Sequence, residues 1–354
     1  MARFEATVSR LGTVLESDGS PAEAEGVLNP ACARAPGGEL LLYPRVVAAG
    51  NVSRVGLLRA GDGARFERLG FALEPEKPYE MRPPGCGGMG CEDPRVTYVP
   101  ALERYVMVYT GFGPLGPRVV FALSTDAYHW ERLGPVDFKT HALASGDDKD
   151  GVFFPEPVRS PAGVLSFAFF HRPMKALSTL DGHAAIPQLL ELPPSEREST
   201  CIAYIPVDAV RADIRNLLVP HESLIVLAPD GPWGRLKTGG GTPPVRVAEG
   251  WFSLYHAVDA VEIDGRYAMT YSAGIVILDI DRPHIVRYRS PVPVLSPEHP
   301  DEMHGVVNNV VFPTGIDVRG ERNLDIYYGM ADARIGRAAI ALPPAAVAGK
   351  TAAA

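Results

Sequence analysis

The chain has 354 residues, of which 34 are Lys or Arg and 42 are Asp or Glu, and its formal net charge is −8. No long run of one charge occurs, which argues against nucleic acid or an anionic membrane as the main partner. No segment reaches the ~18–20 consecutive apolar residues of a membrane span, and the first residues, MARFEATVSRLG, lack the apolar core of a signal peptide. We therefore expect a cytoplasmic protein.

The cysteines are few and widely spaced. They stand at positions 32, 86, 91 and 201, which is too sparse for a disulfide scaffold and lacks the two close pairs of a structural zinc site. Two of them flank a glycine run in CGGMGC, where a metal knuckle or a disulfide is a less favoured interpretation. We interpret the glycines as permitting a close approach of the backbone, and we expect no metal.

Proline steps divide the chain into repeating units. Each unit begins with Asn-Pro, Asp-Pro, Phe-Pro or Pro-Pro and continues into a strand rich in aromatic and β-branched residues. The spacing of about 60–90 residues leaves room for four short strands in each unit. The sequence thus predicts an all-β fold, a five-bladed β-propeller in which residues 1–354 form one domain. The units begin near residues 29, 93, 154, 243 and 312, with the sequences NPACARAPGGELLLYPRV, DPRVTYVPALERYVMVYTG, FPEPVRSPAGVLSFAFFHRP, PPVRVAEGWFSLYHAV and FPTGIDVRGERNLDIYYGMAD.

Helical periodicity is confined to two segments of the chain. These are PQLLELPPSERES at 187–199 and VDAVRADIRNLL at 207–218, and prolines bracket both. We expect both segments to be short helical insertions on one rim of the propeller.

Polar residues recur at the same phase of the units. Because the innermost strand of each blade directs one end at the central channel, these residues should converge on one axial pocket. One or two carboxylates beside several cations are typical of a site that handles a sugar and an oxyanion together. Taken singly, each has a plainer explanation as a turn residue, a solvated charge or a satisfied histidine. The residues singled out are Asn29, Arg45, Arg54, Glu92, Asp93, Arg95, Lys149, Arg172, Lys237, His256 and Asp332.

Two common catalytic patterns are not indicated. The glycine runs GGMG and GGG lack the Lys-Ser or Lys-Thr that follows a phosphate-binding P-loop. No GxSxG is present, and the serines near the predicted axis have no obvious partner base, so a Ser-His-Asp triad is not expected.

Several ordered motifs together carry a family likeness. The motifs are CEDPRVT, KDGVFFPEPV, HRP after LSFAFF, LKTGGGTPPVR, GWFSLYHAV, VVFPTG and LDIYYGMADARIGRA. Through them the chain resembles, from about residue 29 to about residue 338, glycoside hydrolase family 130, whose members are five-bladed propellers acting mainly as inverting phosphorylases on β-mannosides, with a smaller branch of β-1,2-mannosidases.

The resemblance implies roles for individual residues. It assigns the general acid to Asp93, which in the family is thought to protonate the glycosidic oxygen through the 3-hydroxyl of the mannosyl unit. Where several members have Asn after the first phosphate-binding cation, this chain has Asp150, whose carboxylate is expected to pair with a cation and weaken phosphate binding. The implied phosphate-binding residues are Lys149, Arg172, Lys237, His256 and Tyr267, and the mannosyl-subsite residues are Asn29, Arg45, Arg54 and Asp332, with Glu92 and Arg95 as further substrate-binding neighbours of the acid.

Physical reasoning about these residues favours phosphorolysis. Phosphate is already a nucleophile, so one acid and a set of cations suffice, whereas an inverting hydrolase needs a carboxylate base ~6.5–9.5 Å from the acid. We therefore predict an inverting phosphorylase that cleaves a β-mannosidic bond with inorganic phosphate and releases α-mannose 1-phosphate. It needs no cofactor, and its partners are a β-mannoside oligosaccharide and phosphate.

Other functions stay open. An inverting β-mannosidase is the first alternative, because Asp150 and Glu156 lie close to the phosphate-binding residues in sequence. A non-catalytic glycan-binding propeller is the second, and a hydrolase of pentosides or fructosides fits less well because cations outnumber acids near the repeats. A homo-oligomer is compatible with the sequence, and the segment 175–200, which should help to select the acceptor sugar, matches no motif.

Overall fold

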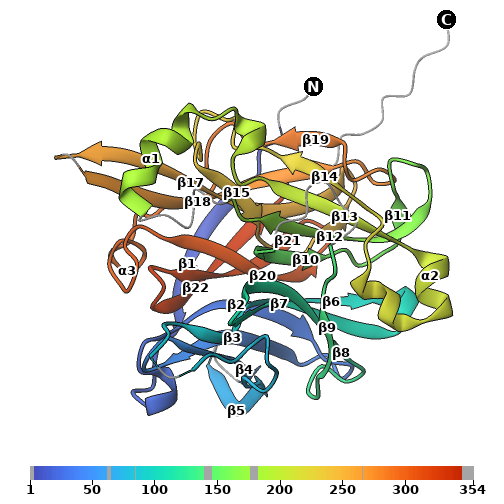
Figure 1. The fold of residues 1–354 in the computed structure, drawn as a ribbon, viewed down its shortest axis with the longest axis horizontal. Coiled ribbons are helices and arrows are strands. Elements are labelled where there is room, and N and C mark those ends of the chain that lie inside the picture. The colour runs from blue at the N-terminus through green and yellow to red at the C-terminus, as the bar shows by residue number, and fades with distance from the viewer. Residues whose placement is uncertain are drawn as a thin grey trace, which may run out of the picture.

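The protein is built almost entirely of β-strands, which confirms the all-β prediction. The computed structural model describes residues 4–61, 65–83, 85–138, 146–175, 182–264 and 266–344. Within these ranges the strands fall into five consecutive groups of antiparallel neighbours (Figure 1). The first group contains β2 (Gly26–Arg34), β3 (Leu40–Ala48), β4 (Val52–Ala60) and β5 (Phe66–Leu73); the second contains β6 (Met89–Val99), β7 (Arg104–Gly113), β8 (Gly116–Ser124) and β9 (Glu131–Pro135).

The third and fourth groups each include one additional short strand, and the fifth includes the first strand of the chain. The third group contains β10 (Asp148–Phe153), β11 (Val158–Arg159), β12 (Leu165–Pro173), β13 (Thr200–Pro206) and β14 (Glu222–Leu227). The fourth contains β15 (Lys237–Gly240), β16 (Val245–Val247), β17 (Gly250–Ile263), β18 (Arg266–Leu278) and β19 (Val286–Arg289). The fifth contains β20 (Val311–Gly320), β21 (Asn323–Met330), β22 (Arg334–Ala341) and β1 (Thr7–Leu15).

Two pairings connect distant parts of this order. Strand β1 pairs with β22 from Thr7 opposite Ala341 to Leu15 opposite Ile335, so the N-terminal strand completes the C-terminal group. A short parallel ladder, Val52 with Met89 and Ser53 with Gly90, joins β4 to β6 and makes the first two groups one eight-stranded sheet. The first and last strands of the chain are therefore held in one sheet.

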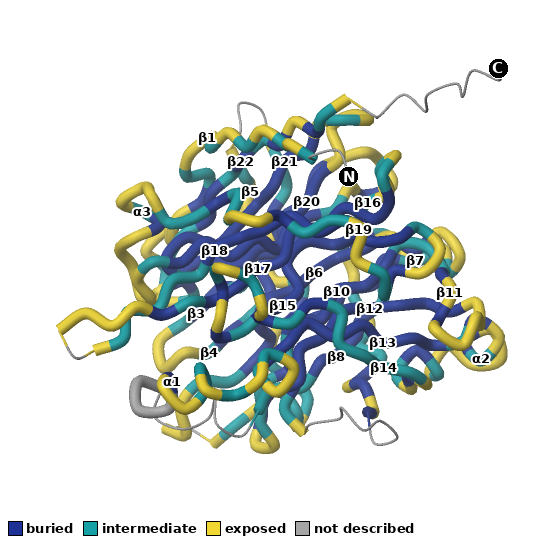
Figure 2. Tube along the Cα trace, turned by 90° about the horizontal axis from the view of Figure 1, so that it is seen from above, coloured by how far each residue is buried: buried dark blue, intermediate teal, exposed yellow. Residues whose placement is uncertain are grey.

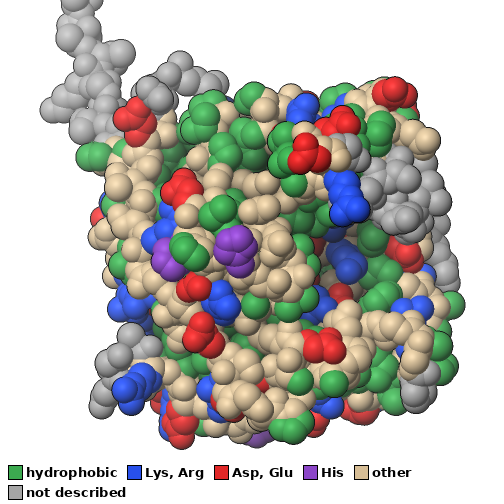
Figure 3. All heavy atoms as spheres, turned by 90° about the vertical axis from the view of Figure 1, so that its left-hand side faces the viewer, with side chains coloured by type: hydrophobic (Ala, Val, Ile, Leu, Met, Phe, Trp, Pro, Cys, Tyr) green, Lys and Arg blue, Asp and Glu red, His purple; other side chains and the backbone are tan. Residues whose placement is uncertain are grey.

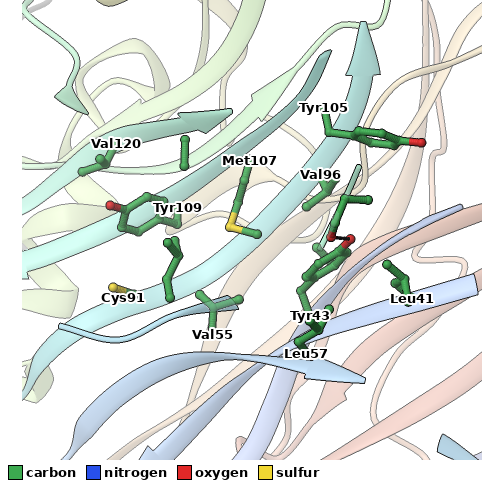
Figure 4. Packing of buried hydrophobic residues seen from close by; sticks show 14 of the residues in the cluster. Leu41, Tyr43, Val55, Leu57, Cys91, Val96, Tyr105, Met107, Tyr109 and Val120 are labelled. Carbon is green, nitrogen blue, oxygen red and sulfur yellow. Dashed lines mark hydrogen bonds between the residues drawn. The ribbon is translucent and has the colours of Figure 1, made fainter. Parts of the chain in front are cut away.

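Apolar clusters lie between neighbouring groups. Between the first and second groups, Tyr43 and Val55 face Met107 and Tyr109 (Figure 4), and the Tyr43 hydroxyl donates to the Ala127 carbonyl at 2.7 Å. Similar clusters join the second to the third, the third to the fourth and the fourth to the fifth group. One more cluster packs the fifth group against the first. Buried residues accordingly run through the middle of the molecule, and exposed ones lie on the connections and on peripheral strands such as β1 and β5 (Figure 2).

The helical insertions do not share one rim as the sequence predicts. Helix α1 (Gly182–Glu191) lies in the connection between β12 and β13, whereas α2 (Val207–Ala212) directly follows β13, and the two lie at opposite ends of the molecule (Figures 1 and 2). Because β12 and β13 are antiparallel, the connection before β13 and the connection after it lie at opposite strand ends. A third helix, α3 (Pro300–Met303), precedes β20, and short 3-10 helices occupy Pro21–Glu23, Pro100–Leu102, Pro194–Glu196 and Ile214–Leu218.

The first strands of three groups share a local irregularity. Their pairing register shifts between Leu28 and Ala31, between Glu92 and Arg95, and between Lys149 and Val152. At each shift an Asn or Asp adopts a left-handed backbone, with φ of 43° at Asn29, 47° at Asp93 and 56° at Asp150. Such bulges redirect a side chain, and Asn and Asp tolerate this conformation better than most residues. The third shift lies at Asp150–Gly151, upstream of the Phe154–Pro155 step.

Two further features concern possible membrane-spanning helices and the cysteines. Within the described ranges, no helix is both long enough and apolar enough to cross a membrane. All four cysteines carry free thiols, so Cys86 and Cys91 are not bonded to each other in this structure.

The junction between the first two groups should be sensitive to a single methyl group. Gly90 has φ of 119°, and a Cβ there would overlap the Ser53 carbonyl in the ladder between β4 and β6. We expect Gly90→Ala to lower the free energy of unfolding by at least about 2 kcal/mol more than Gly38→Ala, since both share a strained φ but nothing lies within 4 Å of a Cβ at Gly38. Chemical denaturation of the two variants measures the difference, and equal losses would contradict the proposed overlap.

Candidate active site

The candidate site is assembled from strands of several groups. Its side chains come from β2, β3, β6, β10, β12, β15 and β17 and from the β21–β22 turn. Figure 3 looks onto the end of the molecule that carries α1, α3 and the β17–β18 hairpin. That surface is hollowed, and basic and acidic side chains are visible inside the hollow.

Asp93 lies among hydrogen-bond donors. Its Oδ1 accepts from Asn29 Nδ2 at 2.9 Å and from Arg45 Nη1 at 3.3 Å, and its backbone carbonyl accepts from Arg95 Nη1 at 2.9 Å. The residue is only 8% exposed. Burial opposes ionisation of Asp93, but the charges of Arg45 and Arg95 and the bond from Asn29 outweigh it and lower its pKa. In the free protein this carboxyl is therefore ionised.

Glu92 lies beside Asp93 and connects two cations. Its Oε1 accepts from Arg45 Nη2 at 3.0 Å, and its Oε2 lies 3.4 Å from Lys149 Nζ. Arg45 is further held by Ser53 Oγ at 2.9 Å. One arginine thus bridges the two adjacent carboxylates while its Nε is fixed by a buried hydroxyl.

Asp332 differs from Asp93 in the direction of its pKa shift. It follows Ala331 in the turn after β21, and both have a left-handed backbone. Burial raises the pKa of Asp332 to about 6, and the nearby charge of Asp93 adds to this effect. Two carboxyl groups of one site thus have pKa values displaced in opposite directions, an arrangement common where protons are exchanged.

The cation at Arg172 is paired with two buried carboxylates. Its Nε donates to Asp150 Oδ2 at 2.6 Å, and its Nη1 contacts Glu198 Oε2. His256 Nε2 lies 3.4 Å from the same Asp150 oxygen, and Arg95 Nη2 lies 3.8 Å from Asp150 Oδ1. Burial opposes ionisation of Asp150, but the charge of Arg172, the contact with His256 and the charge of Arg95 hold its pKa well below the usual range. The pairing of Asp150 with a cation is therefore present, as the sequence predicts.

Lys237 contacts an aromatic ring. Its Nζ lies 5.3 Å from the ring centre of Tyr271, which in turn stacks on His256 at 6.5 Å between ring centres. Tyr267, the tyrosine that the family likeness implies, precedes Tyr271 by four residues on β18 and lies opposite Glu262, whereas Tyr271 lies opposite Val258. The tyrosine next to the predicted phosphate-binding residues is therefore Tyr271.

Three other expectations need correction. Arg54 Nε lies 3.2 Å from Glu74 and its guanidinium covers Phe71, because its side chain leaves β4 on the face opposite Ser53. Arg95 is 1% exposed and donates to the carbonyls of Gly240 and Gly241 as well as Asp93, so its guanidinium is engaged by the backbone.

Glu156 is the third correction. It forms an exposed ion pair with Arg246, at 2.6 Å between Oε2 and Nη2, and its contacts do not include the cations of the site. Of the two carboxylates that favoured a β-mannosidase in the sequence, only Asp150 therefore lies among the cations of the site.

A buried relay supports the backbone of Arg172. His171 Nδ1 lies 2.6 Å from Asp148 Oδ2 and its Nε2 lies 2.7 Å from Ser223 Oγ, which is the connectivity of a hydrolase triad. However, His171 has no exposed surface and stacks on Phe138 at 4.4 Å, while Asp148 Oδ1 accepts from the Arg172 N–H at 3.0 Å. The relay therefore fixes the strand that carries Arg172.

Some residues of the site carried no usable sequence signal. Glu198 lies in the segment 175–200, which matches no motif, and its contact with Arg172 depends on a long connection returning to the site. Tyr271 and Tyr267 belong to the same strand and face, so only the register of β17 against β18, with Val258 opposite Tyr271, distinguishes them. Ser53 could have been found, since strand alternation separates it from Arg54.

As a whole the arrangement combines an acid held by donors with a group of cations. Asp93 is held by Asn29 and Arg45, Glu92 lies beside Lys149, and Lys237 and Arg172 supply further positive charge. Positive charge fixed in a partly buried site stabilises phosphate and the negative charge that develops on a leaving oxygen. Among the described residues, no group of three or more His, Cys, Asp or Glu could hold a metal ion.

Comparison with known proteins identifies the family. The family model described as β-1,4-mannooligosaccharide phosphorylase matches residues 4–179 and 217–343. A 1,2-β-oligomannan phosphorylase of Thermoanaerobacter sp. (strain X514) is 29% identical over 289 residues, which cover 80% of this chain and 77% of that protein. A β-1,4-mannooligosaccharide phosphorylase of Ruminococcus albus is 36% identical over 114 residues, 32% of this chain and 33% of that protein.

Solved structures agree on the fold. A β-1,2-mannobiose phosphorylase from Listeria innocua, solved with β-1,2-mannobiose, superposes with a TM-score of 0.69 over 94% of this chain and 96% of that one, at 21% identity. The family model matches more than half of the chain, as the ordered motifs of the sequence predict. The chain belongs to glycoside hydrolase family 130.

Proposed function

We propose that the protein is an inverting β-mannoside phosphorylase that transfers a mannosyl unit to inorganic phosphate and releases α-mannose 1-phosphate. The observation that carries the proposal is the presence, in one site, of Asp93 held by Asn29 and Arg45 and of the cations Lys149, Arg172 and Lys237. The names of the relatives support the same reaction. We place β-1,2-linked mannosides first, because relatives named for that linkage match about four-fifths of the chain.

We also infer that the five groups of strands are the blades of one five-bladed β-propeller. Consecutive groups pack through apolar clusters, the fifth packs against the first, and β1 completes the sheet of β22. In this arrangement the first strand of each blade lies nearest the axis, which accounts for the meeting of Asn29, Asp93 and Asp150.

In the proposed reaction the bond between C1 of the mannosyl unit and the glycosidic oxygen breaks while a phosphate oxygen bonds to C1 from the opposite face. Asp93 supplies the proton that the departing oxygen takes up, through the mannosyl 3-hydroxyl, and phosphate brings its own electron pair. A bound sugar excludes water from Asp93 and so raises its pKa toward the protonated form that this step requires. Phosphate needs no proton acceptor, so one catalytic carboxyl suffices.

A β-mannosidase is the second candidate. The observation that favours it is the double pairing of Arg172 with Asp150 and Glu198, which reduces the net positive charge available to phosphate. Against it, Asp150 is 2% exposed and its oxygens face cations, so it is a weak base for activating water.

The choice between the two is made by the phosphate dependence of mannobiose cleavage. We expect purified protein to consume β-1,2-mannobiose only when inorganic phosphate is present and to release equal amounts of mannose and α-mannose 1-phosphate. Proton and phosphorus NMR identify both products and the anomer. Mannose released at the same rate in phosphate-free buffer would instead establish the mannosidase.

Replacement of Asp93 tests its role as acid. Asn at this position cannot donate a proton, so Asp93→Asn should lower kcat for mannobiose by about 10²–10⁴-fold. With 2,4-dinitrophenyl β-mannoside, whose leaving group needs no proton, the loss should be much smaller. An equal loss on both substrates would show that Asp93 only binds the sugar, and Glu156→Gln, at the exposed ion pair, serves as the control.

The raised pKa of Asp332 predicts a pH-dependent stability change. The pKa of Asp332 is about 6 in the native state and near 3.8 in the unfolded state. Asp332 therefore lowers the free energy of unfolding above pH 6, where the carboxyl is ionised in both states. It has little effect below pH 4, where the carboxyl is largely protonated in the native state and increasingly so in the unfolded state. Asp332→Asn removes this penalty and should raise the free energy of unfolding by roughly 1–3 kcal/mol at pH 7.5, with little change at pH 4. Urea unfolding at both pH values measures it, and a gain that is the same at both would contradict the assignment.

A further inference from the structure

The positive charge of Arg172 is already balanced before any ligand binds. Its guanidinium donates to Asp150 at 2.6 Å and contacts Glu198, and all three residues are at most 5% exposed. A bound oxyanion that relies on Arg172 must therefore compete with two carboxylates of the protein itself.

The local backbone conformation places the Asp150 carboxylate against the Arg172 guanidinium. Its left-handed conformation, at φ of 56°, lies in the bulge of β10, and this bulge turns the side chain toward β15 and β17. Gly239 on β15 faces it, and a Cβ there would overlap both Asp150 Oδ2 and the His256 ring. The contact between Asp150 and His256 thus depends on the absence of a side chain at position 239.

The remaining charges of the site are unevenly distributed. Burial lowers the pKa of His256 despite the opposing charge of Asp150, so this ring is neutral at neutral pH. Lys149 shares its charge with Glu92 at 3.4 Å. Within the described part of the chain, Lys237 forms no ion pair within 4.0 Å, and its ammonium group contacts Tyr271 instead. Lys237 is therefore the cation most available to an incoming anion, and Arg172 the least.

We propose that Asp150 is a specificity-determining residue that weakens the binding of inorganic phosphate by acting as an internal counter-anion for Arg172. The inference rests on the proposed phosphorylase function and identifies the residue that sets its affinity for the second substrate. Phosphate is held mainly by Lys237 and Lys149. Arg172 contributes to phosphate binding only to the extent that its ion pair with Asp150 is broken. Loss of the Asp150 charge frees Arg172 without removing a side chain from the site.

The test is the binding of phosphate alone, measured by isothermal titration calorimetry on the full chain without mannoside. Asp150→Asn keeps the shape and one acceptor oxygen, and we expect it to lower the Kd of phosphate at least tenfold and to lower the Kd of sulfate as well. In kinetics the KM for phosphate should fall while the KM for mannobiose is unchanged. Glu156→Gln, which removes the same charge at an exposed ion pair, should leave both constants unaltered.

Each other result overturns the inference. An unchanged or higher Kd for phosphate in a folded Asp150→Asn protein shows that Asp150 does not compete with the anion. Tighter sulfate but weaker phosphate binding shows that Asp150 accepts a hydrogen bond from hydrogen phosphate. If Asp150→Asn does not fold, as judged by circular dichroism, Glu198→Gln decides the question, because it removes the second carboxylate from Arg172 and should tighten phosphate binding in the same direction.

These outcomes are separate from a failure of the proposed function. If the unaltered protein releases mannose without phosphate and Asp150→Asn abolishes that release, Asp150 is the base of a mannosidase, and both the function and the inference fail. If the unaltered protein requires phosphate but its Kd does not respond to Asp150→Asn, only the inference fails.

Discussion

The site depends on a guanidinium buried where three groups of strands meet. Arg95, on β6, donates to the Asp93 carbonyl of its own strand and to the carbonyls of Gly240 and Gly241 in the fourth group, and it faces Asp150 of the third. Burying an unpaired arginine is costly, so these acceptors must stay in place for the protein to fold. The same contacts therefore hold Asp93, Asp150 and the glycine-rich end of β15 in one fixed arrangement.

Environment gives three similar side chains different chemistry. Asp93 is ionised because Arg45, Arg95 and Asn29 outweigh its burial. Asp332 retains a proton to higher pH because its burial and the charge of Asp93 outweigh the opposing charge of Arg45, and Asp150 stays ionised through Arg172. The side chain of Asp93 is held by Asn29 and Arg45, which both belong to the first group. In the proposed reaction, such differences in environment let one aspartate act as the acid while its neighbours bind or balance charge.

Some expectations fail for a common reason. Position in a motif selected Arg54, Arg95 and Tyr267. Strand alternation, however, points the Arg54 side chain away from Ser53, and the carbonyls of the fourth group engage Arg95. The pairing register places Tyr271, and not Tyr267, beside His256. The helical segments were recognised from periodicity, yet their separation to opposite ends follows from the antiparallel order of β12 and β13. Each of these differences concerns where a side chain or a connection points in the folded protein, which a sequence pattern does not specify.

Local chemistry was readable from the chain alone. Alternating apolar strands, Asn-Pro and Asp-Pro steps and ordered motifs were enough to predict an all-β member of this family and to select Asp93, Asn29 and Arg45, because bulge-forming residues and strand periodicity are encoded within a few neighbours. The sequence predicted that Asp150 pairs with a cation, but only the tertiary structure decided that this cation is Arg172 and that Glu198 pairs with it as well. Glu198 reaches Arg172 across a long connection, and the extent to which two carboxylates neutralise one cation depends on distance and burial, which arise only when remote strands pack together.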